Sequence, residues 1–199
     1  MNFLEVLLTY SGLSAIIFYR LAHKLRQIHM PFFPRFISQF AKFLTGIEIH
    51  PGATIGEGLF IDHGMGVVIG ETSIIGNNVT LFQGVTLGGT GKERGKRHPT
   101  LGNNIVVGAG AKILGNVNIG DNVQIGANAV VVKDVPPNST AVGIPGRVVR
   151  KEGKKIPGIS LDHTSLPDPI AQRLDKLQDE IDHIEEEIRD YRKKKPWNT

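Results

Sequence analysis

The sequence predicts a mainly β protein, a parallel β-helix of hexapeptide repeats placed between an N-terminal helical segment and a C-terminal helix. Two observations support this fold class. An aliphatic residue recurs at every sixth position through most of residues 49–131, and 24 glycines are scattered rather than gathered in low-complexity runs, many of them directly after the aliphatic residue. A period of six fits neither an α-helix nor an alternating strand. It is typical of a β-helix, in which each short strand points one aliphatic side chain inward.

The repeat keeps its phase in three runs. The phase slips by two positions after Val67, and the stretch GGTGKERGKRHPT at residues 88–100 interrupts it a second time. A loop that leaves a rigid solenoid is a favourable place for a functional site. The aliphatic positions are Ile49, Ile55, Ile61 and Val67, then Ile69, Ile75, Leu81 and Leu87, then Leu101, Val107, Ile113, Ile119, Ile125 and Val131.

The first two segments follow from this pattern. We expect residues 1–45 to be helical, with Pro31 and Pro34 separating a first helix from one or two further turns that begin near Phe36. We expect residues 46–150 to form the β-helix, with residues 88–100 as its excursion loop.

The remaining residues are expected to form a linker and a helix. Residues 151–169 contain the proline and glycine of a loop-like linker. In residues 170–195 the apolar positions alternate at spacings of four and three, which is a heptad seam. The alternative is an amphipathic helix folded back onto its own chain. The seam consists of Ile170, Leu174, Leu177, Ile181, Ile184, Ile188 and Tyr191.

Composition excludes several classes of protein. There is no cysteine, which excludes disulfides, thiolate metal ligands and a cysteine nucleophile. The apolar stretch at residues 6–18 is too short for a membrane span, so we expect a buried or interface helix, no membrane association and a cytoplasmic location. The net charge is +4, with basic clusters at residues 92–97 and 147–155 that favour a phosphorylated ligand. No nucleic-acid partner is expected, because no aromatic platform accompanies these clusters.

Several residues could catalyse acyl transfer. The sequence has no nucleophile elbow, Walker loop or dinucleotide fingerprint. Transfer to a hydroxyl group needs a general base, for which histidine is suited, and a carboxylate on its other ring nitrogen would fix the tautomer. Spacing alone leaves open whether the histidines are catalytic or structural. The candidates are Arg97 and His98 in the loop, and Glu48, His50, Asp62 and His63 in the repeat.

A resemblance to a known family makes these candidates specific. The motifs IDHG, LGGTGK and RHP occur in this order, and VPPNSTAVGIPGRVV follows them. With these motifs, roughly residues 4–150 resemble serine acetyltransferases of the hexapeptide-repeat superfamily. The resemblance implies a left-handed β-helix that transfers the acetyl group of acetyl-CoA to the hydroxyl of L-serine. The products would be O-acetyl-L-serine and CoA.

The resemblance also implies roles for individual residues. His63 matches the general base, and Glu48 matches its carboxylate partner, where many members of the family have Asp. Asp62 matches the residue that meets the substrate ammonium, and Arg97 the residue that meets the substrate carboxylate. His98 matches a further substrate-binding position.

The CoA site is implied in the same way. Gly89, Ala109 and Ala127 match positions where the backbone lines the pantetheine and acetyl groups. Arg147 matches a position suited to the CoA phosphates. No metal is implied for the reaction.

The resemblance also implies how the subunits assemble and which partner enzyme is expected. Relatives of this fold form homotrimers with active sites between neighbouring chains. Longer members carry further N-terminal helices, which pair trimers and hold another substrate-contacting Asp, so a single trimer is the expected assembly here. Members that dock into O-acetylserine sulfhydrylase end in Ile, whereas this sequence ends Pro196-Trp197-Asn198-Thr199.

Three alternatives remain at this point. The closest is a hexapeptide acetyltransferase that acts on a sugar or antibiotic hydroxyl, which would not need both charges of Asp62 and Arg97. The second is a carbonic anhydrase on the same prism, with Zn²⁺ held by His50, His63 and His98. The third is a non-catalytic scaffold, which would need the repeat but not the IDHG and RHP motifs.

Overall fold

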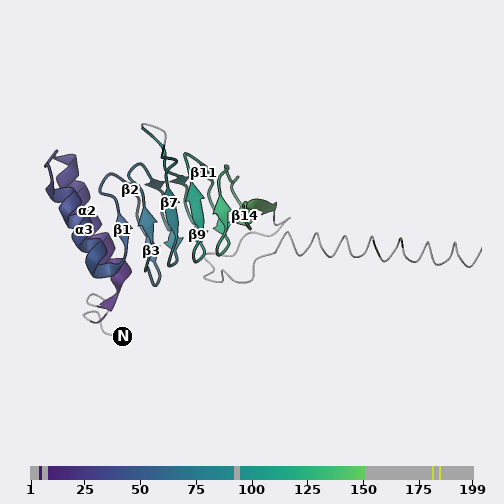
Figure 1. The fold of residues 1–199 in the computed structure, drawn as a ribbon, viewed down its shortest axis with the longest axis horizontal. Helices are drawn as coiled ribbons and strands as arrows, with labels where there is room; N and C mark the ends of the chain where they lie inside the picture. Colours follow the sequence, from purple (N-terminus) through teal and green to yellow (C-terminus); the bar gives the residue numbers. More distant parts are fainter. Residues whose placement is uncertain (1–4, 6–8, 92–94, 151–180, 182–183, 185–199) are drawn as a thin grey trace, which may run out of the picture. The chain divides into compact units, whose positions relative to one another are not determined.

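The computed structural model describes residues 5, 9–91, 95–150, 181 and 184 (Figure 1). The chain divides into two compact units, Met1–Leu166 and Pro167–Thr199. The linker at residues 151–169 and nearly all of the heptad seam at residues 170–195 lie outside the described residues. Among the described residues, no helix is long and apolar enough to cross a membrane.

Three parallel sheets form the sides of a prism in the first unit, and we call them sheets A, B and C (Figure 1). Sheet A contains β1 (Glu48–Ile49), β4 (Val68–Ile69), β7 (Thr86–Gly88), β10 (Lys112–Leu114) and β13 (Val130–Val131). Sheet B contains β2 (Thr54–Ile55), β5 (Ile74–Ile75), β8 (Thr100–Leu101) and β11 (Asn118–Ile119). Sheet C contains β3 (Phe60–Ile61), β6 (Thr80–Leu81), β9 (Val106–Val107), β12 (Gln124–Ile125) and β14 (Ser139–Val142), with β15 (Arg147–Arg150) antiparallel to β14.

The repeat residues form the core of the prism. In sheet A, Ile49 pairs with Ile69, Ile69 with Leu87, and Leu87 with Ile113 in register. Every aliphatic repeat position identified in the sequence is buried. The predicted fold class, a left-handed parallel β-helix with N-terminal helices, is therefore confirmed.

Two edges of the prism carry the residues of interest, and both border sheet A. The CA edge consists of the corners between sheets C and A, at residues 62–67, 82–85, 108–111 and 126–129. Backbone hydrogen bonds link successive corners, for example from Gly84 N to Met65 O and from Asn128 N to Ala109 O. The AB edge consists of the corners between sheets A and B, and it includes the excursion loop between β7 and β8.

The slip in the repeat phase falls in the first corner of the CA edge. Ile61 and Ile69 are eight positions apart, whereas Leu81 and Leu87, which flank the next corner, are six apart. The first corner is therefore two residues longer than the second and can bulge from the prism. Asp62 and His63 lie in this longer corner.

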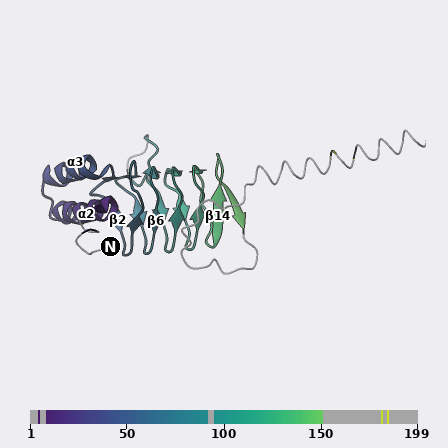
Figure 2. The same ribbon diagram turned by 90° about the horizontal axis from the view of Figure 1, so that it is seen from below.

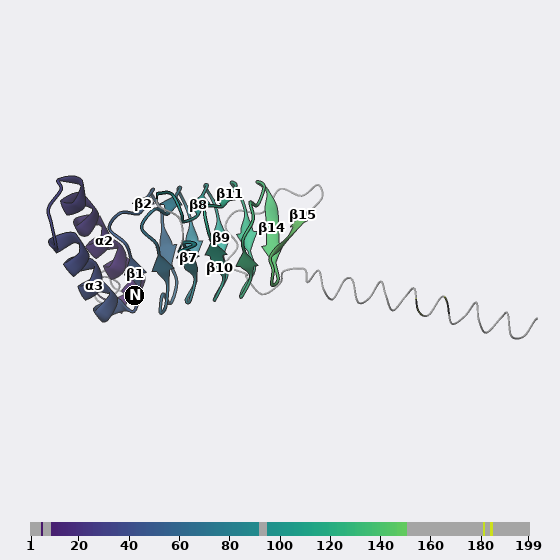
Figure 3. The ribbon, with the colours of Figure 1, turned by 45° about the horizontal axis from the view of Figure 1, so that its top comes forward.

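Helices α2 (Ser11–Gln27) and α3 (Phe33–Thr45) lie beside the first coil (Figures 2 and 3). Helix α2 buries Gly12, where an added Cβ would lie 2.3 Å from Ile61 O, so the helix approaches the prism backbone closely. Its other buried residues include Ala15, Tyr19 and Ala22.

Helix α3 differs from the sequence prediction at its start. It begins at Phe33 rather than near Phe36, because Pro34 fits the first helical turn, where its missing N–H costs no hydrogen bond. It also buries small residues such as Ser38 and Ala41, whereas Phe36 and Phe43 on its other face are exposed. Small side chains allow the helix to pack closely, and the aromatic rings remain on the outside.

Candidate active site

The site residues expected from the sequence fall into two groups. Asp62 and His63 lie at the CA edge, after strand β3, and Arg97 and His98 lie at the AB edge, before strand β8. Sheet A separates the two edges, since β4 follows the Asp62–His63 corner and leads to the AB corner that contains Thr72. One chain therefore holds the predicted site residues in two separate groups, which we call the CA and AB half-sites.

The Asp62–His63 turn presents an imidazole and a carboxylate together. The backbone N–H of His63 donates to Asp62 Oδ1 at 3.1 Å, and His63 Nε2 lies 3.9 Å from Asp62 Oδ2. The His63 side chain is 73% exposed and that of Asp62 24%, so the ring projects outward beside a partly covered carboxylate. The backbone of His63 has a φ of 58°, in the left-handed region that residues with side chains rarely adopt.

Glu48 lies in strand β1, next to the same edge. Gly46, two residues before Glu48, accepts a hydrogen bond from Gly66 N, in the His63 corner. The Glu48 carboxylate forms an ion pair with Lys42 of helix α3, with 2.6 Å between Nζ and Oε2. Among the described residues no hydrogen bond or ion pair joins Glu48 to His63. The role of Glu48 as the carboxylate partner stays a prediction.

Three of the predicted CoA positions follow the CA edge away from His63. Ala109 lies two corners beyond the His63 corner and Ala127 lies three corners beyond it. At the ordinary spacing between neighbouring strands, three corners correspond to about 14 Å. The hairpin at residues 143–146 then docks on strand β13 through a hydrogen bond from Gly146 N to Val130 O, and exposed Arg147 follows it.

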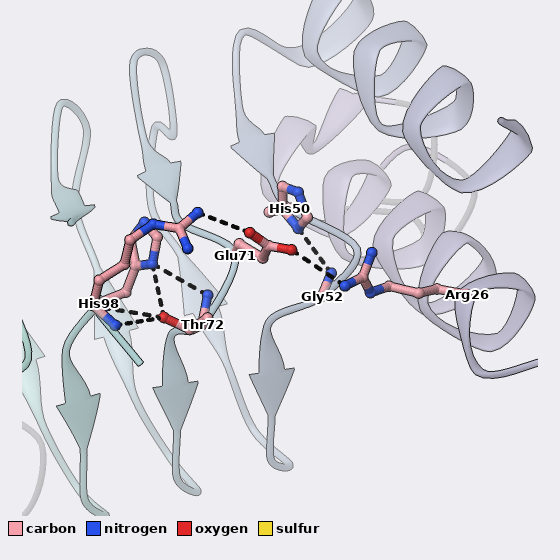
Figure 4. Close-up of polar contacts among 7 residues, drawn as sticks. Arg26, His50, Gly52, Glu71, Thr72 and His98 are labelled. Atoms are coloured by element: carbon pink, nitrogen blue, oxygen red, sulfur yellow. Dashed lines mark hydrogen bonds and ion pairs between the residues drawn. The ribbon is translucent and has the colours of Figure 1, made fainter. Parts of the chain in front are cut away.

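At the AB edge, Glu71 joins two arginines (Figure 4). Its Oε2 lies 2.8 Å from a guanidinium nitrogen of Arg97, and its Oε1 lies 3.2 Å from one of Arg26, in the last turn of helix α2. The Arg97 hydrogen bond, more than any other influence, lowers the pKa of Glu71. Glu71 therefore stays ionised and holds the Arg97 side chain across the edge.

Thr72 fixes the end of the excursion loop (Figure 4). Its hydroxyl oxygen accepts the backbone N–H groups of Arg97 at 3.0 Å and His98 at 3.1 Å. The backbone N–H of Thr72 donates to His98 Nδ1 at 3.2 Å, and the Thr72 hydroxyl lies 2.9 Å from the same nitrogen. Because Nδ1 accepts a hydrogen bond, neutral His98 carries its proton on Nε2.

His98 is buried, and burial, followed by the charge of Arg97, lowers its pKa. Its ring is neutral near pH 7 and can donate a hydrogen bond from Nε2. Gly89 lies beside this nitrogen, since a Cβ added there would be 3.1 Å from Nε2. Gly89 thus groups with Arg97 and His98 in this chain rather than with Ala109 and Ala127.

His50 lies at the same edge, and its Nδ1 accepts the N–H of Gly52 at 3.0 Å (Figure 4). Burial lowers its pKa to about 4, with a further contribution from the charge of Arg35. His50 is close to His98 but lies across sheet A from His63, so the three histidines of one chain do not converge. Among the described residues no cluster of three His, Asp or Glu side chains is arranged for a metal ion.

Sequence reasoning missed Glu71, Thr72 and Tyr10. Glu71 and Thr72 directly follow the repeat glycine Gly70. Polar residues are common at such corners, so a glutamate and a threonine there do not indicate a functional site. Their partners in the RHP motif lie about 25 positions further along, because the excursion loop lengthens that coil. Tyr10 precedes helix α2 and donates to Asp62, 52 positions away.

The sequence and the fold were compared with known proteins. Residues 98–133 match the family "Bacterial transferase hexapeptide (six repeats)", and residues 64–83 match "Hexapeptide repeat of succinyl-transferase". The serine acetyltransferase of Bacillus licheniformis is 58% identical over 188 residues, which are 94% of this chain and 87% of the relative.

Two solved structures are similar as well. Soybean serine acetyltransferase complexed with serine is 46% identical with a TM-score of 0.71, over 73% of this chain and 60% of the soybean chain. Serine acetyltransferase from Brucella abortus in complex with coenzyme A is 41% identical with a TM-score of 0.73, over 77% of this chain and 62% of the other. The chain thus spans about three fifths of the length of these two solved chains. By sequence, repeat and fold together, the chain belongs to the serine acetyltransferase family.

Proposed function

We propose that the protein transfers the acetyl group of acetyl-CoA to the hydroxyl of L-serine, giving O-acetyl-L-serine and CoA. One observation carries this proposal at the site. The Asp62 carboxylate and the His63 imidazole share one turn, with Oδ2 and Nε2 3.9 Å apart. An acceptor with an amino group and a hydroxyl group on adjacent carbons, such as serine, can meet both at once. The relatives complexed with serine and with coenzyme A support the two substrates.

The reaction needs no covalent intermediate on the enzyme. His63 accepts the proton of the serine hydroxyl while the oxygen attacks the thioester carbonyl carbon. The tetrahedral intermediate collapses, the carbon–sulfur bond breaks, and the imidazolium gives the proton that came from serine to the CoA thiolate. Asp62 would stabilise the imidazolium as well as the substrate ammonium.

The AB half-site would hold the other end of serine. The Arg97 guanidinium can pair with the substrate carboxylate in a bidentate arrangement. His98 would donate from Nε2, because its Nδ1 already accepts from Thr72. Arg26 supports this role. Because Glu71 pairs with both Arg26 and Arg97, its single negative charge neutralises Arg97 only in part, and positive charge remains for the substrate carboxylate.

A complete site would need two chains. His63 and Arg97 lie on different edges, so a single serine molecule requires the CA edge of one subunit and the AB edge of its neighbour. We therefore propose a homotrimer with three shared sites, as expected from the resemblance. Acetyl-CoA would extend along the CA edge past Ala109 and Ala127, with Arg147 near its phosphates. The cytoplasmic location and the sulfhydrylase partner remain predictions.

An acceptor screen tests the function directly. Purified protein is incubated with acetyl-CoA and one acceptor at a time, namely L-serine, L-threonine, L-homoserine or a hydroxylated sugar, and release of free thiol is followed. We expect release with L-serine far above the rate without acceptor. Faster release with a sugar than with serine would refute the proposal and favour the sugar acetyltransferase alternative.

A further inference from the structure

The two oxygens of the Asp62 carboxylate have different surroundings. Oδ1 accepts the hydroxyl of Tyr10 at 3.2 Å and the backbone N–H of His63 at 3.1 Å. Oδ2 faces the His63 ring, 3.9 Å from Nε2. Two donors therefore hold one oxygen in place, and the other is oriented beside the imidazole.

Tyr10 is itself held firmly. Its ring stacks on Phe60 with centroids 5.9 Å apart and an interplanar angle of 26°. Its carbonyl oxygen accepts the N–H of Ser14 at 3.1 Å, at the start of helix α2. Burial, followed by the charge of Asp62, raises the pKa of the Tyr10 hydroxyl, which stays a protonated donor near neutral pH.

The turn that Tyr10 contacts has an unfavourable backbone conformation, which the surrounding residues must stabilise. His63 has a φ of 58° and Gly64 a φ of 75°. A residue with a side chain holds such a conformation only where its surroundings determine it. The Ser11 hydroxyl donates to His63 O at 3.3 Å, so the start of helix α2 makes contacts with both residues of the turn.

We propose that Tyr10 is a positioning residue that orients the Asp62 carboxylate for the ammonium group of the acceptor. This inference rests on the proposed function. With Oδ1 held by Tyr10, Oδ2 meets the ammonium while His63 Nε2 meets the hydroxyl on the adjacent carbon. Without the Tyr10 hydroxyl, the carboxylate can rotate about its χ angles, and fewer of its orientations match a 2-amino alcohol.

The substitution Tyr10→Phe tests this proposal, because it keeps the ring on Phe60 and removes only the donor. We expect the KM for L-serine to rise about tenfold, in the range for a lost hydrogen bond to a charged group. The KM for acetyl-CoA should stay unchanged. Equal changes in both KM values, or no change in either, would overturn the positioning role.

A matched control comes from helix α2, which Tyr10 directly precedes. The Tyr19 hydroxyl also donates a hydrogen bond, to Ala53 O at 2.7 Å. This contact joins helix α2 to the prism and does not involve the Asp62–His63 turn. We expect Tyr19→Phe to lower the unfolding temperature and leave the ratio of the two KM values as in the unsubstituted protein. A rise in serine KM of the same size in Tyr19→Phe would show that loosening helix α2, not losing the Tyr10 donor, is responsible.

A double-substitution cycle separates this inference from the proposed function. If Tyr10 acts through Asp62, Tyr10→Phe should change serine kinetics less than twofold when Asp62→Asn is already present. An undiminished effect in that background would overturn the inference, even if the single variants lose activity. If the unsubstituted protein does not acetylate serine, the proposed function itself fails, whereas an active protein unaffected by Tyr10→Phe refutes the inference alone.

Discussion

Gly70 lies directly against the ring of His98, since a Cβ added to Gly70 would be 1.9 Å from His98 Cδ2 and 2.1 Å from Nε2. The imidazole thus occupies space that any other residue type would fill. The glycine that follows the repeat position here has a specific role, which is to let His98 reach the N–H of Thr72.

Gly70→Ala should therefore displace His98. We expect the free energy of unfolding to fall by about 1–3 kcal/mol, as for other overpacked sites, and the serine KM to rise. The double variant Gly70→Ala, His98→Ala has room for the new methyl group. Gly70→Ala should consequently cost little stability in the His98→Ala background, and a full cost there, measured by chemical denaturation, would contradict the packing argument.

His63→Ala should lower turnover by a factor on the order of 10² to 10⁴, as expected for loss of a general base. The affinity for acetyl-CoA should be nearly unchanged, because the predicted CoA positions Ala109 and Ala127 lie further along the CA edge. Steady-state kinetics and CoA binding by calorimetry check both statements. Near-full turnover in this variant would remove His63 from the mechanism.

Arg97→Ala should weaken the binding of serine by about 10- to 100-fold and leave acetyl-CoA binding largely intact, since the guanidinium would meet only the amino-acid carboxylate. Arg97→Lys should recover only part of the loss, because an ammonium group lacks the planar bidentate geometry. The ratio of the two KM values is the measurement. If both substrates weaken equally, Arg97 belongs to the CoA site and the sugar alternative gains support.

Stability should depend on pH through His50. Its pKa in the folded protein is about 4, below the ordinary 6.5, because burial disfavours the charged ring. Between these values the unfolded chain binds more protons than the folded one, so the free energy of unfolding should fall as the pH is lowered from about 6.5 towards 4. His98 should act in the same direction, since burial also lowers its pKa.

The variant His50→Gln tests this assignment by chemical denaturation at several pH values. Glutamine can still accept the N–H of Gly52 but does not titrate. We expect the fall in stability between pH 6.5 and 4 to become shallower than in the unsubstituted protein. An identical pH profile in the two proteins would place the acid sensitivity elsewhere.

Because the two half-sites lie on different edges of one chain, we predict that the active protein is a trimer. Light scattering should give a trimer for the full chain, and deletion of the residues after Pro169 should lower thermal stability but leave an active trimer. A full-length hexamer would contradict the single-trimer expectation. A truncated monomer would show that the C-terminal residues, not the prism, hold the subunits together.

The sequence by itself was sufficient to predict the β-helix, because a period of six is a one-dimensional property that the coil length imposes on the core. Two irregularities in the repeat also coincide with the two groups of predicted site residues. The two-residue slip after Val67 reflects the long corner that holds Asp62 and His63, and the second interruption is the loop that ends at Arg97 and His98. In each case extra residues leave the regular coil, and the spacing between the flanking aliphatic residues increases accordingly.

The tertiary structure alone decided which side chains support those half-sites. Thr72 and Glu71 meet the RHP motif only because successive coils stack at the AB edge, and Tyr10 meets Asp62 only because helix α2 lies beside the first coil. It also decided that α3 turns Phe36 and Phe43 outward. These contacts depend on how the corners and helices pack against each other. The packing uses small side chains and corner backbone, and a repeat period carries no information about the distances between the segments that pack in this way.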